Sequence, residues 1–589
     1  MFRLRRAAVG GTIGLLIGIL FTLFVNFVSN TNVSLATLGG PLWVLIAAFL
    51  IGLWYAVLFE PHRDNYAENV STGLVLGIIL WFVWAISLQP FLVGKGESWQ
   101  AVEAITAVPK LITYILQGGL VGFVYGLLFG WLAKSLKLHS TEILGPPEIT
   151  KRVVIIGGGY AGVSAAQVLE KELAKHPAIG VTLVSQNNFL IHTPMLSEVS
   201  ASAVNAQNIS PSLRSFFKNV QVIQSDIANI DLDKRIVHLR ADTRSTKKDL
   251  HFDHLILTAG SVPNFFGNKN IEKEAFSFKS LEDATIIRNQ IIDMFERADL
   301  EPNSEKRKQM LTFVVAGGGF AGVELLGGMN DFARGICFYY PNVNPADVRT
   351  VLVHSRERIL PELSEALGEF AKEKLIERGV EFQLGVRVTD ARPGFVVTGE
   401  QEIPSNTFIW TAGNRPSHVL SLLDLPLTKR GQLEVNTALQ VLHTDNIWAA
   451  GDCAQVPDLT TGKFAPPTAQ HALREGKVAG YNVAAALTGK PLKTFKFKTL
   501  GSLAALGHQL AVAEVFGRRF SGFFAWLLWR GIYLSKLPTL QKQVRVLLDW
   551  ILDVFFPPDI VQTINFSQKE REQQRVMTEG NGRSPEVQA

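Results

Sequence analysis

The chain has 589 residues, 47% of them hydrophobic, and a formal net charge of only +5 at pH 7. At roughly 100–200 residues per domain, this length predicts several domains, and the apolar content predicts a part that contacts a membrane. The composition argues against nucleic-acid binding, because no dense block of Lys and Arg is interleaved with aromatic residues. Cys337 and Cys453 are too few for a disulfide framework, so we expect a structural role for both in a reducing compartment.

Residues 1–138 contain four apolar runs, at about 10–28, 41–59, 70–92 and 111–133. Each is about as long as the ~20 residues that a helix needs to cross ~30 Å of hydrocarbon, so the pattern predicts four transmembrane helices. Arg3, Arg5 and Arg6 precede the first run, and loop 29–40 has no basic residue, which predicts an N-terminus on the inside. The expectation is a multi-pass protein of the inner (cytoplasmic) membrane with its catalytic part on the cytoplasmic side. A signal peptide is the alternative for the first run.

No ionisable residue lies deep in these runs, which favours an anchor or small bundle over a transport path. Recurrent glycines predict close helix packing. They are Gly11, Gly14 and Gly18 in the first run and Gly118, Gly119, Gly122, Gly126 and Gly130 in the fourth. Residues 139–150 are polar with a Gly-Pro-Pro sequence, which predicts a linker.

One strand–turn–helix pattern occurs twice after the linker, as VVIIGGGYAGVSAAQVL at 153–169 and FVVAGGGFAGVELLGGM at 313–329. Its G-x-G-x-x-G core permits a tight turn and close approach of a pyrophosphate, to which the helix N-terminus offers N–H groups. Two copies, each after an apolar strand, predict two dinucleotide sites in parallel α/β sheets. The candidate contacts are Gly157, Gly158, Gly159, Tyr160, Ala161 and Gly162 in the first turn, and Gly317, Gly318, Gly319, Phe320, Ala321 and Gly322 in the second.

Both copies lack the acidic residue that usually binds the adenosine ribose at the end of the next strand. Ser185 stands there in the first copy and His354 in the second, with Ser355 and Arg356 behind it. A His/Ser/Arg cluster could accommodate a 2′-phosphate, so NADPH is an alternative to NADH. Equally, Arg356 could be a solvated surface charge.

The flanking motifs resemble, in order, those of two-dinucleotide-binding-domain flavoproteins, and within them the type II NADH dehydrogenases (NADH:quinone oxidoreductases). The resemblance covers about residues 151–564. It rests on HTPMLSEVSAS (192–202), DHLILTAGSVPNFFG (253–267), NTFIWTAGNRP (406–416), TDNIWAAGDCAQVPD (444–458), PPTAQHALREG (466–476) and GSLAALGHQLAVAEVFG (501–517).

The resemblance implies an α/β fold of tandem Rossmann-like FAD- and NAD(P)-binding domains, here preceded by an all-α transmembrane region of four helices and followed by C-terminal amphipathic helices. It implies bound FAD, NADH or NADPH as co-substrate, a quinone acceptor, contact with membrane lipid and a possible homodimer. No metal site is indicated. The expected boundaries are 1–138 (transmembrane), 139–150 (linker), 151–270 and 401–520 (the two parts of the FAD domain), 271–400 (NAD(P) domain), 521–564 (amphipathic segment) and 565–589 (disordered tail).

The resemblance also implies roles for single residues. Asp452 would bond the ribityl chain, and Glu324 would act in nucleotide or acceptor handling, although an acid in a helix's first turn is also simply favourable. Gln470 is the acceptor-side candidate. Arg474 and Glu475 stand where the family commonly has paired glutamines. They could form a surface charge pair, or they could suit a different quinone headgroup. Further cofactor contacts are expected at Ile227, Ala259, Gly260, Ala469 and Gly413.

Near the C-terminus, one helical face carries Val544, Leu547, Leu548, Ile551 and Phe555. We expect it in the membrane interface, with Arg530, Lys536 and Lys542 near headgroups and Trp526, Trp529 and Trp550 as interfacial residues. Protein core or a dimer interface is the alternative.

The sequence therefore predicts a membrane-bound, non-proton-pumping oxidoreductase that passes a hydride from NAD(P)H to FAD and electrons to a membrane quinone. A sulfide:quinone oxidoreductase is one alternative, but it needs a redox cysteine pair at the flavin. A flavin-binding membrane redox sensor with little turnover is the other.

Overall fold

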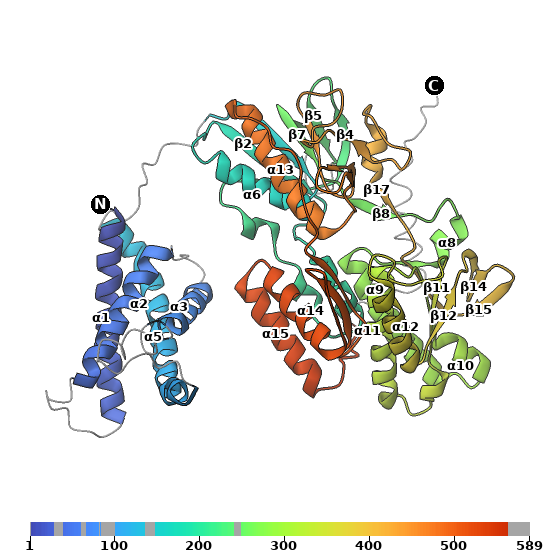
Figure 1. The fold of residues 1–589 in the computed structure, drawn as a ribbon, viewed down its shortest axis with the longest axis horizontal. Coiled ribbons are helices and arrows are strands. Elements are labelled where there is room, and N and C mark those ends of the chain that lie inside the picture. The colour runs from blue at the N-terminus through green and yellow to red at the C-terminus, as the bar shows by residue number, and fades with distance from the viewer. Residues whose placement is uncertain are drawn as a thin grey trace. The chain divides into compact units, whose positions relative to one another are not determined.

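The computed structural model describes residues 2–28, 39–59, 66–81, 83, 101–135, 148–240 and 249–562, in two compact units, Met1–Pro146 and Pro147–Ala589 (Figure 1). Most of the expected linker and the expected disordered tail lie outside the described residues, as does most of the third apolar run beyond Leu80.

The first unit contains four described helices: α1 (Phe2–Val28), α2 (Gly39–Leu58), α3 (Tyr66–Leu80) and α5 (Ala101–Ser135). Its glycines bring helix backbones together, as predicted. A Cβ atom on Gly14 would lie 3.0 Å from Gly52 Cα, and one on Gly118 would lie 2.9 Å from the carbonyl carbon of Gly73. Side chains at these positions would push α1 from α2 and α5 from α3.

The prediction of four transmembrane helices is not supported. Among the described residues, only α5 contains a helical segment long and apolar enough to cross a membrane, Leu111–Leu128. The apolar helical segments found among the described residues of the other three helices are shorter: Ala7–Leu20, Leu45–Leu58 and Asn69–Leu80. The multi-pass topology built on four spans is therefore not supported either.

The second unit begins with a parallel five-stranded sheet of order β19-β7-β1-β2-β3. Its central strand is buried because Val153–Ile156 are apolar on both faces. Helices α6 (Tyr160–Glu172) and α13 (Ala469–Thr488) lie side by side on it (Figure 1), and Gly476 of α13 packs against the Ala161 backbone. The strands are β1 (Lys151–Ile156), β2 (Ile179–Ser185), β3 (Gln221–Gln224), β7 (His254–Leu257) and β19 (Ile447–Ala449).

A second parallel sheet, of order β12-β11-β10-β16-β9, follows the same plan. Its strands are β9 (Phe276–Ser277), β10 (Thr312–Ala316), β11 (Arg349–His354), β12 (Val380–Leu384) and β16 (Thr407–Trp410). The accompanying helices are α8 (Lys269–Glu274), α9 (Leu281–Leu300), α10 (Ser304–Met310), α11 (Phe320–Ile336) and α12 (Glu365–Glu377), with an antiparallel sheet of β13 (Val388–Arg392), β14 (Phe395–Thr398) and β15 (Gln401–Pro404).

Smaller elements connect the two sheets. They are the antiparallel β4 (Ile227–Asp231), β5 (Ile236–Leu239) and β6 (Asp249–His251), the pair β8 (Ser261–Pro263) and β17 (Asn414–Pro416), the short strands β18 (Leu433–Glu434), β20 (Ala454–Gln455), β21 (Pro457–Asp458) and β22 (Lys463–Phe464), and the one-turn helix α7 (Leu196–Ser200).

The C-terminal part has three antiparallel strands and two helices: β23 (Gly501–Ala505), β24 (Ala511–Val515), β25 (Arg518–Ser521), α14 (Gly522–Lys536) and α15 (Leu540–Phe555). Trp526, Trp529 and Trp550 are at most 7% exposed and share a core with Leu196 and Val199 of α7. Their prediction as interfacial residues is therefore wrong.

Arg530 is also buried, so it is not a headgroup contact as predicted. The predicted apolar face of α15 does point outward. Its residues Val544, Leu547, Leu548, Ile551 and Phe555 are 44–75% exposed.

Candidate functional site

The first glycine turn joins β1 to α6 at the carboxyl edge of the first sheet. Gly157 has a φ of +107°, a conformation that other residues avoid, and a Cβ atom on Gly162 would collide with the carbonyl oxygen of Gly157. The Thr258 hydroxyl donates hydrogen bonds to the carbonyl oxygens of Ile156 (2.7 Å) and Gly157 (3.1 Å), which holds the turn. Gly159 faces open space, with nothing within 4 Å of an added Cβ atom.

Asp452 reaches the same edge from the far end of the chain, because β19 pairs with β7. Its Oδ2 accepts hydrogen bonds from the Ser261 hydroxyl (2.6 Å) and from Lys279 Nζ (3.4 Å). Ser185 ends β2 and lies under Gly158, while Ala259 and Gly260 follow β7. These candidates therefore gather at one sheet edge, as a dinucleotide site requires.

The other candidates lie further along the chain. Ile227 begins β4, and Ala469 begins α13. Gly413 follows β16, and a Cβ atom there would lie 2.8 Å from the Phe266 ring.

The second turn repeats this geometry. Gly317 has a φ of +121°, a Cβ atom on Gly322 would collide with the carbonyl oxygen of Gly317, and Gly319 faces open space. His354 packs over Gly318, whose N–H donates a 3.0 Å hydrogen bond to His354 Nδ1. Burial and the nearby charge of Arg356 lower the pKa of His354. His354 is thus a neutral acceptor rather than a cation.

Both turns have the features that a bound nucleotide requires. Each leaves space before a helix N-terminus, where backbone N–H groups and the helix dipole favour phosphate. Each also lies beside a buried ring nitrogen that has no hydrogen-bond partner among the described residues, His192 Nε2 near Tyr160 and His354 Nε2 near Gly318. A dinucleotide at each turn fits these residues.

Glu324 lies in the second turn of α11 and faces the C-terminal helices. Its Oε1 accepts hydrogen bonds from the Ala505 N–H and the Trp529 indole N–H, both at 3.1 Å. Burial raises the pKa of Glu324 to about 8, against the effect of these donors. Glu324 is thus a carboxyl group that exchanges a proton near neutral pH.

Aromatic groups connect the surroundings of Glu324 with the first turn. The Trp529 ring packs edge-on against Tyr533 at 4.8 Å, and Tyr533 packs against His192 at 6.0 Å between ring centroids. The Tyr160 hydroxyl lies 2.9 Å from His192 Nδ1. The sequence predicts Tyr160 as a cofactor contact but not His192 or Tyr533, because the His192–Tyr533 contact joins segments more than 300 residues apart.

The helix α13 presents the expected acceptor-side residues. Gln470 is half-buried, and its Nε2 lies 3.4 Å from the Gly501 carbonyl oxygen. Arg474 lies over the Phe497 ring and donates a 2.8 Å hydrogen bond to the Gln470 carbonyl. Glu475 is buried and accepts a 2.7 Å hydrogen bond from the Gly451 N–H, so the interpretation as a surface charge pair is wrong.

The two cysteines do not form a redox pair. Both are buried, in separate cores around the two sheets. Burial raises the pKa of the Cys453 thiol to about 12, so it stays protonated and unreactive. This arrangement does not provide the dithiol that sulfide oxidation requires.

Comparison with known proteins agrees with this geometry. Residues 151–476 match the pyridine nucleotide-disulphide oxidoreductase family, and residues 499–558 match the NDH2 C-terminal domain. The type II NADH:quinone oxidoreductase Ndh of Mycobacterium tuberculosis is 30% identical over 427 residues, which cover 69% of this chain and 89% of the relative. The type II NADH:quinone oxidoreductase of Haemophilus influenzae is 29% identical over 431 residues, which cover 68% and 97%.

Solved structures show the same fold at lower identity. NDH2 from Plasmodium falciparum in complex with NADH has a TM-score of 0.64 and 19% identity, over 70% of this chain and 99% of that one. The sulfide:quinone oxidoreductase of Aquifex aeolicus has a TM-score of 0.52 and 17% identity, over 69% and 96%.

Proposed function

The chain belongs to the type II NADH:quinone oxidoreductase family, and from this premise we propose that it oxidises NADH and reduces a membrane quinone through one bound FAD. The pairing of two open glycine turns at the ends of two parallel sheets carries this proposal. When bound, FAD accepts one hydride, with its two electrons, from a nicotinamide and passes the electrons to an acceptor.

We assign FAD to the first turn. The N–H groups at the start of α6 would hold its pyrophosphate, and Asp452, fixed by Ser261 and Lys279, would accept a hydrogen bond from the ribityl chain. Residues 151–270 and the part of 401–520 that includes β19 and α13 form its domain, since β19 returns to the sheet of β1. Residues 271–400 form the nicotinamide domain together with β16, which pairs with β10, so the expected boundary at residues 400 and 401 moves to after Trp410.

NADH is the preferred donor in this proposal. A 2′-phosphate needs a cationic partner, and His354 is kept neutral by its hydrogen bond from Gly318 and by burial. Arg356 is exposed to solvent. NADPH should therefore reduce the flavin with a much lower kcat/KM than NADH.

Glu324 and Gln470 are proposed to act on the acceptor side. Glu324 holds the proton that quinone reduction consumes, and Gln470 at the start of α13 orients the acceptor. The exposed apolar face of α15 lies on the membrane surface, where it gives the site access to a lipid-soluble quinone.

Stopped-flow absorbance tests the proposal. Bound flavin should bleach on mixing with NADH and recover on adding a short-chain quinone analogue. Absence of flavin would overturn the proposal, whereas bound flavin that recovers too slowly to sustain turnover would overturn it in favour of a redox sensor. Replacing both cysteines with serine should leave the two phases unchanged, whereas their loss would revive the sulfide reading.

A further inference from the structure

Quinone reduction by NADH consumes one proton from solution. NADH transfers a hydride, which supplies two electrons and one hydrogen, and the quinol carries two hydroxyl hydrogens. The balance is NADH + H⁺ + quinone → NAD⁺ + quinol. A buried site that completes this reaction therefore needs a route by which a proton arrives from water.

A cavity of about 250 Å³ lies behind Glu324, between α7, α11, the loop after β23 and the two C-terminal helices. It has room for several water molecules at about 30 Å³ each. The acidic and basic side chains of its lining are Glu198, Glu324, Asp331, His508, Arg530 and Asp553.

The inner wall of this cavity has two carboxyl groups, each held by a tryptophan. Glu324 accepts from Trp529, and Glu198 Oε2 accepts a 2.8 Å hydrogen bond from the Trp550 indole N–H. The Glu198 side chain is only 12% exposed. The two acids are close enough for the charge of Glu198 to raise the pKa of Glu324.

Arg530 balances this acidic lining. It is 8% exposed, and its guanidinium lies over the rings of Trp526 and Trp550 at 4.0 and 4.6 Å. Its Nη2 lies 3.8 Å from Glu198 and 3.6 Å from Asp553. Its Nε, which is buried, has no hydrogen-bond partner among the described residues and can bind a cavity water.

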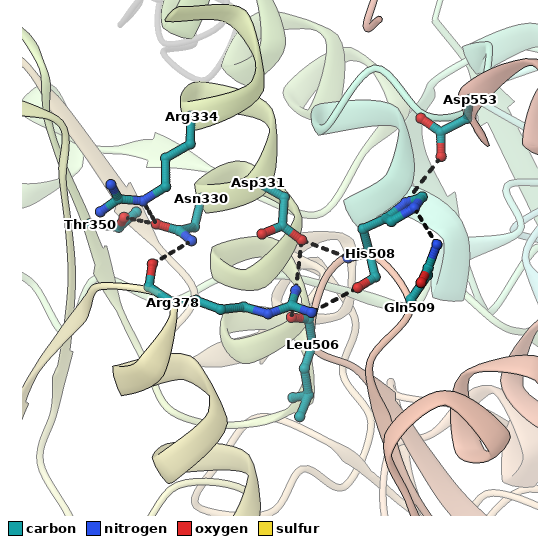
Figure 2. Close-up of polar contacts among 9 residues, drawn as sticks. All are labelled: Asn330, Asp331, Arg334, Thr350, Arg378, Leu506, His508, Gln509 and Asp553. Carbon is teal, nitrogen blue, oxygen red and sulfur yellow. Dashed lines mark hydrogen bonds and ion pairs between the residues drawn. The ribbon is translucent and has the colours of Figure 1, made fainter. Parts of the chain in front are cut away.

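The outer end of the cavity is formed by His508, whose imidazole is 39% exposed and lies 3.7 Å from Asp553. Figure 2 shows how its loop is held. Asp331 accepts hydrogen bonds from the backbone N–H of His508 (2.6 Å) and from the Arg378 guanidinium (2.9 Å). Arg378 also donates to the backbone carbonyl of His508 (2.8 Å). This network keeps the His508 imidazole at the outer end of the cavity, in contact with solvent.

We propose that this cavity is the proton inlet of the enzyme, in which Glu198 relays protons from the mouth at His508 and Asp553 to Glu324. The inference rests on the proposed function, since it supplies the proton that the quinone half of the reaction consumes. Glu198 acts through Glu324 and touches neither substrate nor flavin.

The protonation equilibria suit this role. Burial raises the pKa of Glu198 to about 7, against the opposing charge of Arg530. Glu198 therefore gains and loses a proton near neutral pH, and its relay weakens as pH rises above about 7. The charged groups that face it are Glu324 from α11, Arg530 from α14, Asp549 and Asp553 from α15, and Asp331 and His508 across the cavity.

Single-mixing kinetics of the flavin-loaded enzyme test this inlet, with the two half-reactions measured separately. Glu198→Gln keeps the size of the side chain. It should leave reduction by NADH within about twofold, but slow reoxidation by a short-chain ubiquinone analogue at least about tenfold and remove the decline of that rate near pH 7. In Glu198→Ala, added formate should restore the reoxidation rate, because a small acid can occupy the vacated volume.

The matched control is Glu296→Gln. Glu296 is an exposed carboxylate on α9 that accepts a hydrogen bond from the Tyr340 hydroxyl, and its replacement should alter neither half-reaction. Unchanged reoxidation in Glu198→Gln would overturn the inlet, and so would equal slowing of both phases or a slow Glu198→Ala that formate does not rescue. Failure of NADH to reduce the wild-type flavin would instead overturn the proposed function.

Discussion

The substitution Trp529→Phe tests the pKa of Glu324. The Trp529 indole N–H donates a 3.1 Å hydrogen bond to Glu324 Oε1, the oxygen that also accepts from the Ala505 N–H. Both donors favour the ionised carboxylate, so they lower a pKa that burial raises to about 8. Trp529→Phe removes one donor and keeps an aromatic ring in the core.

The size of the effect follows from the strength of that bond. A hydrogen bond to a charged acceptor contributes about 1.5–3 kcal/mol, and one pKa unit corresponds to about 1.4 kcal/mol. Losing it should raise the pKa of Glu324 by roughly 1–2 units, so the carboxyl group keeps its proton to higher pH. The volume lost at a fully buried site should also reduce stability by roughly 1–3 kcal/mol.

The assay is the pH dependence of flavin reoxidation by a quinone analogue, measured with the Tm of the same samples. The decline of the reoxidation rate near pH 8, which reports Glu324 rather than Glu198, should move upward by about 1–2 pH units in Trp529→Phe. Trp448→Phe is the matched control, because Trp448 is equally buried but donates to His254 in the first sheet's core. An unmoved decline in Trp529→Phe, or the same displacement in Trp448→Phe, would refute the reasoning.

Three further predictions test the second turn, the buried acid and the outer face. Gly322→Ala places a Cβ atom against the Gly317 carbonyl, so a titration of flavin reduction should show KM for NADH raised at least about tenfold with flavin content unchanged. Glu324→Gln should be more stable than wild type by roughly 1–3 kcal/mol in urea at pH 8.5 and not at pH 4.5. The sign follows because its folded pKa of about 8 exceeds the ordinary 4.5, so ionisation opposes folding as pH rises between these values. Leu548→Glu, on the exposed face of α15, should weaken binding to lipid vesicles about tenfold or more in flotation and leave turnover with a water-soluble quinone unchanged.

The glycine turns could be predicted from sequence because their geometry is local. Gly157 and Gly317 have φ values of +107° and +121°, which only glycine adopts without strain. At Gly162 and Gly322, a side chain would collide with the carbonyl oxygen of the first glycine of the same turn. The need for glycine arises within the six residues of each turn, so those six residues are enough to predict it. Asp452 could be placed only through the resemblance of its motif to the family's, because its partners Ser261 and Lys279 are distant in the sequence.

The errors concern residues whose surroundings come from distant segments. Trp526, Trp529 and Trp550 have a helical spacing that suits a membrane interface and a protein core equally, and only the packing of α7 against them decides for the core. Glu475 follows Arg474 on one helix, so an exposed pair was a reasonable expectation. Its burial depends on Gly451, which lies across the sheet edge.

Glu198 had a sequence signal that was not used. It is the one acid in the short stretch Met195–Val199, whose other members are apolar or serine, and burial of such an acid requires a partner. The partners, Trp550 and Arg530, arrive from helices more than 300 residues away. The same two helices thus carry opposite chemistry on their two faces: an exposed apolar surface suited to lipid and quinone, and an inner wall of Arg, Trp and carboxyl groups. Quinone reduction needs an apolar substrate from the lipid and a proton from water. The outer face of the C-terminal helices suits the first and their inner face suits the second.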